Sequence, residues 1–519
     1  MTGDGGLSVR TAGMIAFAAG LLTRAVHVIG YLLGTRTELY YWPVLACRKF
    51  ESAAVGLLQG SPPEGPFTYA SPLYRYFLLP FYASGTGRTG LFVFQSLLGA
   101  TAAWMLFRLA LRAGAGTRAA LAAAVIWCLY APAVFLELTI LPVSLLTLIV
   151  TWFTLIQTGS RSGSVRSAGS GLLAGVMAGL RPPFVFLLAP VLWKRVRAGE
   201  WMPAALAAAG LALPLIFLSF QQKAMGGGFY PFPRTAGCNL ALGHSSESTG
   251  YGPPVPSLGL VETGRGDIHD VAARVAADLG HETPEEADAY WTDTALSWIR
   301  EHPAEELRLI AVKLGGFFGH RPFDSYYELG RAGSFNPVLK LYTVPRLAVV
   351  ILFLVGLVPF LIRGSHRLAV LAPVAVSMLS SVVFVHSERF FAPVVPCMAA
   401  AGAAGIAVLI REIRRGGGLR WAAAGASGLL LMIPAVVFPV PSVPEPLYIG
   451  SLAVRAYHME DYELALTLFE RAAMTAETGT VVWVQGHSEA ARIAEALGYS
   501  ERARQHRQIL AGEGFTQVP

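Results

Sequence analysis

The sequence predicts an all-α polytopic membrane protein with about eleven transmembrane segments. Of its 519 residues, 54% are hydrophobic and only 14% are charged, whereas a soluble domain carries about a quarter charged residues. Apolar runs recur along the chain, and several reach the length of about 20 residues that a spanning helix needs. The net charge of +7 arises from basic residues that lie mostly beside apolar runs. This pattern is typical of membrane topology signals and excludes nucleic-acid binding.

Nine apolar runs qualify as single spans. They are residues 12–33, 88–110, 118–136, 139–157, 203–222, 341–362, 367–385, 390–411 and 421–440. The first run has no small-residue cleavage site after it, so we interpret it as a retained helix and not as a signal peptide.

The segment 170–193 differs because Arg181-Pro182-Pro183 interrupts it, and proline disfavours helix in the residue before it. Short loops rich in Lys and Arg are typical of the cytoplasmic side of a membrane. Five such loops lie near residues 112–118, 161–166, 194–197, 363–367 and 411–420. All five can lie inside only if 170–193 enters the membrane and returns as two short helices. We therefore predict a broken hairpin with Arg181 at its apex, an N-terminus inside and a C-terminus outside, in the inner membrane.

Three segments are then predicted on the outer, periplasmic face. They are a loop over 34–87, a second loop over 223–340 with helices near 267–280, 284–301 and 303–318, and a tail over 441–519. The chain thus divides into a membrane domain, 1–440, and the tail.

The tail has the pattern of small helical repeats. Ala453, Ala465, Phe469 and Ala472 occupy the small and large positions of a tetratricopeptide helix pair, and 486–510 resembles a degenerate second copy. Because one and a half repeats are not stable alone, we expect the tail to pack on the outer loops. It is also a candidate surface for a protein partner.

Chemistry must come from scattered polar groups near the outer face, because the sequence contains no phosphate-binding loop, GxSxG, HExxH or dinucleotide-binding motif. Glu38, just beyond the first span, is a candidate base for the acceptor hydroxyl in an inverting sugar transfer. The alternative is a solvated acid beside an interfacial aromatic belt formed by Tyr40, Tyr41 and Trp42. Glu137 would complete a carboxylate pair with Glu38, around the acceptor or a divalent metal; the alternative is an acid at a helix end that reaches toward water.

Two arginines are candidates to hold a phosphate. Arg181 lies at membrane depth, where an ionisable residue costs free energy and is therefore a functional candidate. Its planar guanidinium suits a phosphate. The alternative is a structural arginine that caps the open carbonyls of a broken helix. Arg389 and His386 lie together between two spans and could hold the same group, or form a merely solvated turn. Arg24 and His27 share one face of the first helix, and we interpret them as a structural pair.

The cysteines show no metal-ligand spacing. A disulfide between Cys47 and Cys238 is one interpretation, since both fall in outer segments; unpaired thiols are the one we favour. No metal site is predicted apart from the carboxylate pair.

Several short motifs appear in a fixed order over roughly residues 15–410. They are Ser71-Pro72-Leu73-Tyr74, Gln95 with Gly99, Tyr130-Ala131-Pro132, Gly171 through Pro182, Gly237 through Gly243, Glu301-His302-Pro303 with Lys313, and Arg389 through Pro393. Together with the acid after the first span, they resemble the GT-C superfamily, in its protein-mannosyltransferase and aminoarabinose-transferase branch.

The resemblance implies an inverting glycosyltransferase that moves a sugar from a polyprenyl-phosphate donor to a lipid, glycan or protein acceptor at the outer face. It implies that Glu38 is the base and that Arg181 and Arg389 hold the donor phosphate. Tyr40, Asn239 and Lys313 fall on its outer-loop segments and are expected to contact the acceptor.

The chain departs from the family at two positions. Thr37 and Pro142-Val143 stand where the family usually has acids, which weakens the case for a metal. Two other functions fit the composition: a glycan ligase or polymerase that uses polyprenyl diphosphate carriers, and a non-enzymatic lipid transporter or flippase.

Overall fold

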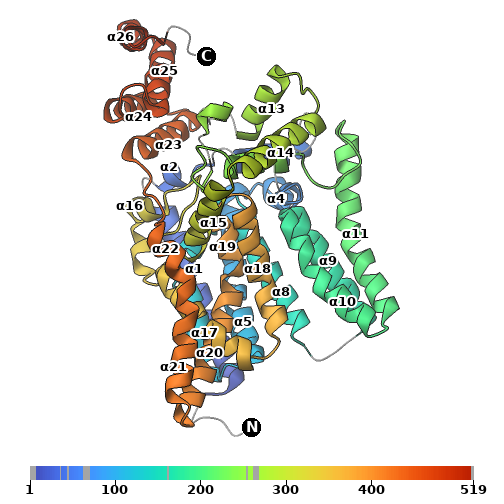
Figure 1. Ribbon diagram of the computed structural model, residues 1–519. Coiled ribbons are helices and arrows are strands. Elements are labelled where there is room, and N and C mark those ends of the chain that lie inside the picture. Colours follow the sequence, from blue (N-terminus) through green and yellow to red (C-terminus); the bar gives the residue numbers. More distant parts are fainter. Residues whose placement is uncertain are drawn as a thin grey trace.

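The computed structural model describes residues 7–34, 37–43, 46–61, 71–159, 163–252, 255–260 and 268–515. Over this part of the chain the protein is helical and contains no β-strand beyond isolated bridges. A bundle of long helices forms one half of the molecule, and shorter helices gather at one end of it (Figure 1).

Six helical segments of the described chain are long and apolar enough to cross a membrane. They are α1 (Val9–Leu33), α5 (Gly87–Ala113), α11 (Trp201–Ala224), α17 (Arg346–Arg363), the stretch Glu388–Arg414 that includes α20 (Val395–Arg414), and the stretch Gly418–Val437 that includes α21 (Gly418–Gly428). Shorter apolar helices are α6 (Thr117–Cys128), α8 (Val143–Gln157) and α18 (Arg367–Val383). These helices confirm a membrane-embedded α-helical protein.

The predicted span 118–136 is not one continuous helix, which corrects the sequence expectation. Helix α6 ends at Cys128, and α7 (Ala131–Leu136) begins after a break at Leu129 and Tyr130. Pro132 occupies the first turn of α7; in a continuous helix its ring would clash with the carbonyl of Cys128, four residues earlier, and it has no N–H to donate to that carbonyl. The break lets Tyr130 leave the helical path and donate to the Glu388 carboxylate.

The predicted hairpin at 170–193 is present as a reversal of the chain. Helix α9 (Ser164–Leu180) is followed by the short 3₁₀-helix η1 (Pro182–Leu188) and by α10 (Ala189–Arg197). Gly171 packs on Ala207 of α11, and Gly175 packs on Leu211. The positions rise together along both helices, so α9 and α11 run parallel, and the chain between them must return to the end at which α9 began (Figure 1).

The predicted basic loops gather at one end of the bundle. The backbone N–H of Ser365 donates to the carbonyl of Ala113, and Arg112 donates to the carbonyl of Leu155. Arg363 forms an ion pair of 2.7 Å with Glu412. The ends of α5, α8, α17 and α20 therefore lie together, at the end that also carries the N-terminus (Figure 1). The loop near 161–166 falls partly outside the described residues.

The opposite end carries the predicted outer segments. The first loop contains α2 (Thr37–Tyr41), α3 (Ala46–Leu58) and α4 (Tyr74–Ala83). The second contains α12 (Ala236–Gly243), η2 (Pro256–Leu258), α13 (Ile268–Asp278), α14 (Pro284–Glu301), α15 (Pro303–Phe318), η3 (Leu329–Arg331), α16 (Ala332–Phe335) and η4 (Pro337–Leu341). The three helices predicted here are confirmed as α13, α14 and α15. All four cysteines are buried and none forms a disulfide, as favoured above.

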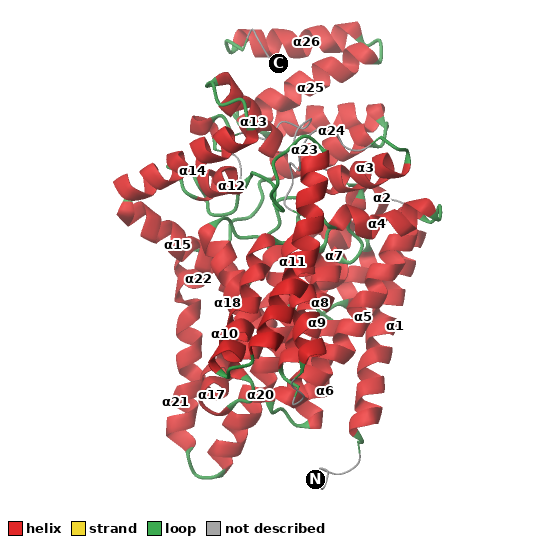
Figure 2. Cartoon of the chain, turned by 90° about the vertical axis from the view of Figure 1, so that its right-hand side faces the viewer, coloured by secondary structure: helices red, strands yellow, loops and turns green. Residues whose placement is uncertain are grey.

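The tail forms four helices, α23 (Glu445–His458), α24 (Tyr462–Thr475), α25 (Val481–Ala496) and α26 (Ser500–Gly512). The predicted small and large positions Ala453, Ala465, Phe469 and Ala472 are all buried between them. The tail and the N-terminus lie at opposite ends of the molecule (Figure 2). Helix α23 packs against α2 and the second loop, which confirms the expected docking of the tail.

Candidate functional site

Arg181 lies at the turn of the hairpin, directly after α9. Its backbone is extended (φ −156°, ψ 106°), the conformation that Pro182 imposes on the residue before it. The side chain is half-buried. Its Nη1 donates to the backbone carbonyl of Arg389 over 3.0 Å, and its guanidinium carbon lies 4.0 Å from the ring of Phe390. The structure thus brings together two arginines that are more than two hundred residues apart in the sequence.

Arg389 lies on α19 (Glu388–Phe391), the short helix that precedes α20. Its Nε is 2.8 Å from the Asp324 carboxylate, and its Nη2 donates to Ser325 Oγ over 2.8 Å. The guanidinium carbon stands 3.7 Å from the ring of Tyr326. One loop segment, 324–326, therefore supplies three contacts that hold this arginine.

Asp324 is the residue of this site that sequence reasoning missed. Its side chain is buried, and it accepts hydrogen bonds from the backbone N–H of Tyr326 and from Ser387 Oγ, each over 2.9 Å, besides the ion pair with Arg389. No motif marks it. The only available signal was a lone acid followed by paired aromatics in an outer loop, a pattern that also occurs around Glu38.

Arg181, Arg389 and Asp324 together form what we call the arginine cluster. Two guanidinium charges and one carboxylate charge leave one net positive charge. Arg389 is held on several sides, whereas Arg181 makes one hydrogen bond within the described chain. Because its side chain is half-buried, its other N–H groups remain accessible to a ligand. A guanidinium with free donors is suited to bind a phosphate oxygen in a bidentate manner.

His386, predicted beside Arg389 as a phosphate ligand, lies in a different environment. It is fully buried, with Nε2 3.4 Å from Nη2 of Arg346 and Nδ1 3.5 Å from Ser381 Oγ. Arg346 forms a buried ion pair with Glu388 and donates to the carbonyls of Gly316, Phe317 and Gly319. These carbonyls lie at the C-terminal end of α15, and the guanidinium of Arg346 caps them. His386 therefore belongs to a buried polar group that fixes helix ends, and it makes no contact with the arginine cluster within the described chain.

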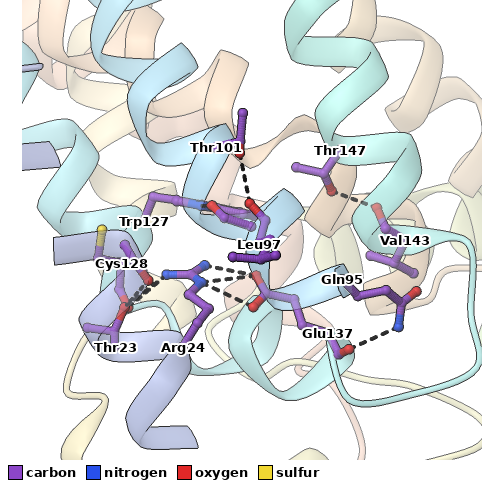
Figure 3. A network of polar contacts seen from close by, with 12 residues as sticks. Thr23, Arg24, Gln95, Leu97, Thr101, Trp127, Cys128, Glu137, Val143 and Thr147 are labelled. Atoms are coloured by element: carbon purple, nitrogen blue, oxygen red, sulfur yellow. Dashed lines mark hydrogen bonds and ion pairs between the residues drawn. The ribbon is translucent and has the colours of Figure 1, made fainter. Parts of the chain in front are cut away.

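Glu137 forms a buried ion pair with Arg24, and the two side chains point toward one another (Figure 3). Nη2 of Arg24 is 2.9 Å from Oε1 of Glu137, and the backbone carbonyl of Glu137 accepts from Gln95 over 2.9 Å. Gly99 makes room for the carboxylate, since a Cβ there would lie 2.0 Å from Oε1. The motif residues Gln95 and Gly99 thus serve this ion pair.

The Arg24–Glu137 pair corrects two expectations. Arg24 does not pair with His27, whose Nε2 lies 3.0 Å from the hydroxyl of Tyr41 instead. Glu137 does not form a carboxylate pair with Glu38, because its carboxylate is buried against Arg24 whereas Glu38 is exposed on α2.

Glu38 is not part of the arginine cluster. It lies close enough to Tyr31 to act on it electrostatically. Tyr40, two residues further along α2, is directed to the other side, since residues two apart on a helix do not face each other. The Tyr40 hydroxyl donates to the carbonyl of Glu328, and its ring stacks on Phe335 at 4.6 Å. Tyr40 is therefore a buried packing residue in this structure.

The two other predicted outer-loop residues are also engaged internally. Asn239 on α12 donates to the carbonyl of Thr235 over 2.7 Å and lies 3.3 Å from His269. Lys313 on α15 is fully buried, 3.0 Å from both the carbonyl of Val382 and Nε2 of His244.

Burial lowers the pKa of Lys313 to about 7, although the nearby Glu306 carboxylate opposes the shift. Glu306 accepts from Nδ1 of His244 over 2.7 Å. The Lys313–His244–Glu306 chain joins α15 to the last carbonyls of α18, just before His386 and Arg389. It supports the turn that carries Arg389.

No group of three or more His, Cys, Asp or Glu side chains suited to a metal ion occurs among the residues that the structure describes. Comparison of the sequence with protein-family models and with curated proteins gives no match in either case.

Proposed function

We propose that the chain is a glycosyltransferase that resembles the GT-C superfamily and takes its sugar from a polyprenyl-phosphate donor at the outer face of the membrane. The observation that carries this proposal is the convergence of Arg181 and Arg389. Both lie where the apolar bundle meets the outer helices, the level at which the phosphate of a membrane-anchored lipid would lie.

The arginine cluster suits the leaving group of this reaction. The acceptor oxygen forms a bond to the anomeric carbon, while the bond from that carbon to the phosphate oxygen breaks and leaves its electron pair on the phosphate. The phosphate gains one negative charge in this step. Guanidinium donors aimed at an oxygen that gains charge stabilise the transition state more than the ground state. In this proposal Arg181 binds the phosphate and Asp324 orients Arg389 beside it.

The acceptor proton must pass to a base, and Glu38 remains the proposed base on the strength of the family resemblance. Glu38 is exposed on α2 and has no hydrogen bond or ion pair with the cluster within the described chain, so the geometry supports the phosphate side of the proposal more than the base. Asp324 is not proposed for this role, because its carboxylate is already engaged by Arg389, Ser387 and the backbone of Tyr326 on the leaving-group side.

The proposed membrane arrangement has eleven segments, with the hairpin 170–193 counted as two. It places the N-terminus in the cytoplasm and the two large loops and the tail in the periplasm. It is supported by the gathering of basic loops at one end of the bundle and by the parallel course of α9 and α11.

The purified protein should transfer labelled sugar from a polyprenyl-monophosphate donor in detergent. We expect Arg181→Gln to lower kcat/KM about 100-fold, the usual effect of losing one donor to a developing negative charge. Arg197→Gln is the matched control, since Arg197 also lies over an aromatic ring, Trp193 at 4.6 Å, but at the opposite end of the bundle. Glu38→Gln should abolish transfer without affecting insertion.

Three results would contradict the proposal. Consumption of diphosphate-linked donors alone would favour a glycan ligase or polymerase. Full activity of Arg181→Gln would remove the arginine cluster from the reaction. Absence of any transfer, combined with movement of the labelled lipid between the two leaflets of a vesicle, would identify a flippase.

A further inference from the structure

Helix α23 of the tail lies against the loop segment that holds Arg389. Arg455 on α23 is only 1% exposed, and its Nη2 donates to the backbone carbonyl of Tyr326 over 2.5 Å. Its Nη1 donates to the carbonyl of Ser451 over 2.9 Å, within the same helix. The guanidinium carbon lies 5.1 Å from the ring of Tyr327. The tail therefore reaches a residue that also contacts the arginine cluster.

Tyr326 connects the two regions through three separate groups. Its N–H donates to Asp324, its ring faces the guanidinium of Arg389, and its carbonyl accepts from Arg455. The backbone of Tyr326 thus has one hydrogen bond to the cluster and one to the tail. A shift of Tyr326 would therefore disturb two contacts of Arg389, the Asp324 carboxylate and the Tyr326 ring.

Burying the guanidinium of Arg455 at this position costs free energy. A buried guanidinium loses its hydration, and no described carboxylate forms an ion pair with it. Its Nε has no hydrogen-bond partner in the described structure either. A leucine or methionine would fill the same space without this cost, so the observed residue is explained by the hydrogen bond that it makes and not by packing.

Other contacts extend the same interface. The guanidinium carbon of Arg331 lies 4.3 Å from the ring of Tyr448 on α23, and Leu39 on α2 packs against the core of the tail. Arg48 on α3 contacts His458 at the end of α23. The first outer loop, the second outer loop and the tail therefore meet around α23.

We propose that α23 is part of the donor site and that Arg455 is a positioning residue. By holding the carbonyl of Tyr326, Arg455 keeps Asp324 and the ring of Tyr326 in place, and so sets the orientation of Arg389 toward an anionic lipid phosphate. This inference rests on the proposed function only for the identity of the ligand. The tail then acts as a structural component of the site, beyond any role in binding a partner.

The test uses the full-length protein with Arg455→Met, Arg455→Lys and the control Arg502→Met. Arg502 is also a tail arginine near a tyrosine, but its ion pair with Glu470 (2.6 Å) stays within the tail. Two properties are measured: amide hydrogen exchange over residues 323–331 and the Kd for a polyprenyl monophosphate without sugar. Kinetics with the complete donor separate the KM for the donor from the KM for the acceptor.

We expect Arg455→Met to raise exchange over 323–331, and to raise the Kd for the polyprenyl monophosphate and the donor KM about tenfold, the usual effect of losing a hydrogen bond from a charged donor. The acceptor KM should not change, and Arg502→Met should behave as the wild type. Arg455→Lys should recover part of the loss, since lysine retains a donor for the Tyr326 carbonyl. If Arg455→Met does not fold, Ser451→Ala, which removes the hydroxyl that accepts from Arg455 over 3.1 Å, should show smaller effects in the same direction.

Unchanged exchange over 323–331 in a folded Arg455→Met would show that the tail does not hold this segment. Raised exchange with unchanged lipid binding would separate the tail from the donor site while leaving the proposed function intact. Failure of the wild type to bind the polyprenyl monophosphate would instead refute the proposed function, although the exchange experiment would still report the contact between the tail and the loop.

Discussion

At the scale of single residues, the buried charges of this protein are neutralised by partners that lie far away in the sequence. Arg24 and Glu137 are 113 positions apart, and the side chains of both are at most 3% exposed. An isolated charge in such a place is strongly destabilising, while a pair with additional hydrogen bonds is tolerated. The pair joins α1 to the segment between α7 and α8.

We predict that Arg24→Met and Glu137→Leu each lower the free energy of unfolding by about 3–5 kcal/mol, since each leaves one buried charge without its partner. The double variant Arg24→Met/Glu137→Leu should be more stable than either single variant. Thermal unfolding in detergent measures the three effects. The control is Arg108→Met, because Arg108 is exposed over Trp104 on α5; additive effects of the two substitutions would show that the ion pair does not stabilise the fold.

At the scale of helices, glycine spacing determines how the hairpin packs. Gly171, Gly175 and Gly179 recur every four residues on α9 and face α11, with Gly210 opposite them. Small residues at this spacing let the backbones of membrane helices approach closely. The close parallel contact forces the chain to return between the two helices, and it thereby fixes Arg181 at the turn.

Gly171→Ala should destabilise the protein by about 1–3 kcal/mol, the usual cost of overpacking, because the added Cβ would lie 1.9 Å from the carbonyl oxygen of Ala207. Gly169→Ala on the same helix meets no atom within 4 Å. That variant should be neutral or more stable, since alanine favours helix by up to about 1 kcal/mol relative to glycine. Melting temperatures of the two variants provide the comparison, and equal values would rule out tight α9–α11 packing.

At the scale of the whole molecule, the structure places the outer helices and the tail at one end and the basic loops at the other (Figures 1 and 2). The arginine cluster is linked to the tail through Tyr326. This polarity is what an enzyme needs if its lipid substrate is presented on one leaflet only. In the proposed arrangement, which follows the positive-inside rule, the basic end lies in the cytoplasm.

Fusions of a reporter protein test this assignment. Alkaline phosphatase joined after Pro519 should be active and green fluorescent protein joined there should be dark, because the tail is expected outside. The same reporters joined after Gly114, at the basic end, should give the opposite result. Fluorescence at both positions would overturn the proposed arrangement.

Much of the fold could be predicted from local patterns, and the errors share a cause. Six of the apolar runs as helices long enough to span, the chain reversal at Arg181-Pro182-Pro183 and the helices α13 to α15 were confirmed, because each depends on hydrophobicity, proline or spacing within a short window. The break before α7 was missed, since Pro132 was not weighed against an apolar run. The pairing of Arg24 with His27 was wrong because it used only neighbours on one helix.

The sequence by itself determined that this chain enters a membrane as helices and where the chain reverses. It also showed which charged residues fall in apolar surroundings, where burying them without a partner would cost free energy. These properties follow from the transfer of each segment between water and lipid, which depends on local composition. Only the tertiary structure decided which of those charges meet. It joined Arg181 to Arg389, supplied Asp324, gave Glu137 to Arg24 and brought Arg455 of the tail to Tyr326. Such contacts depend on how helices distant in the chain pack together, and no local pattern in the sequence records that packing.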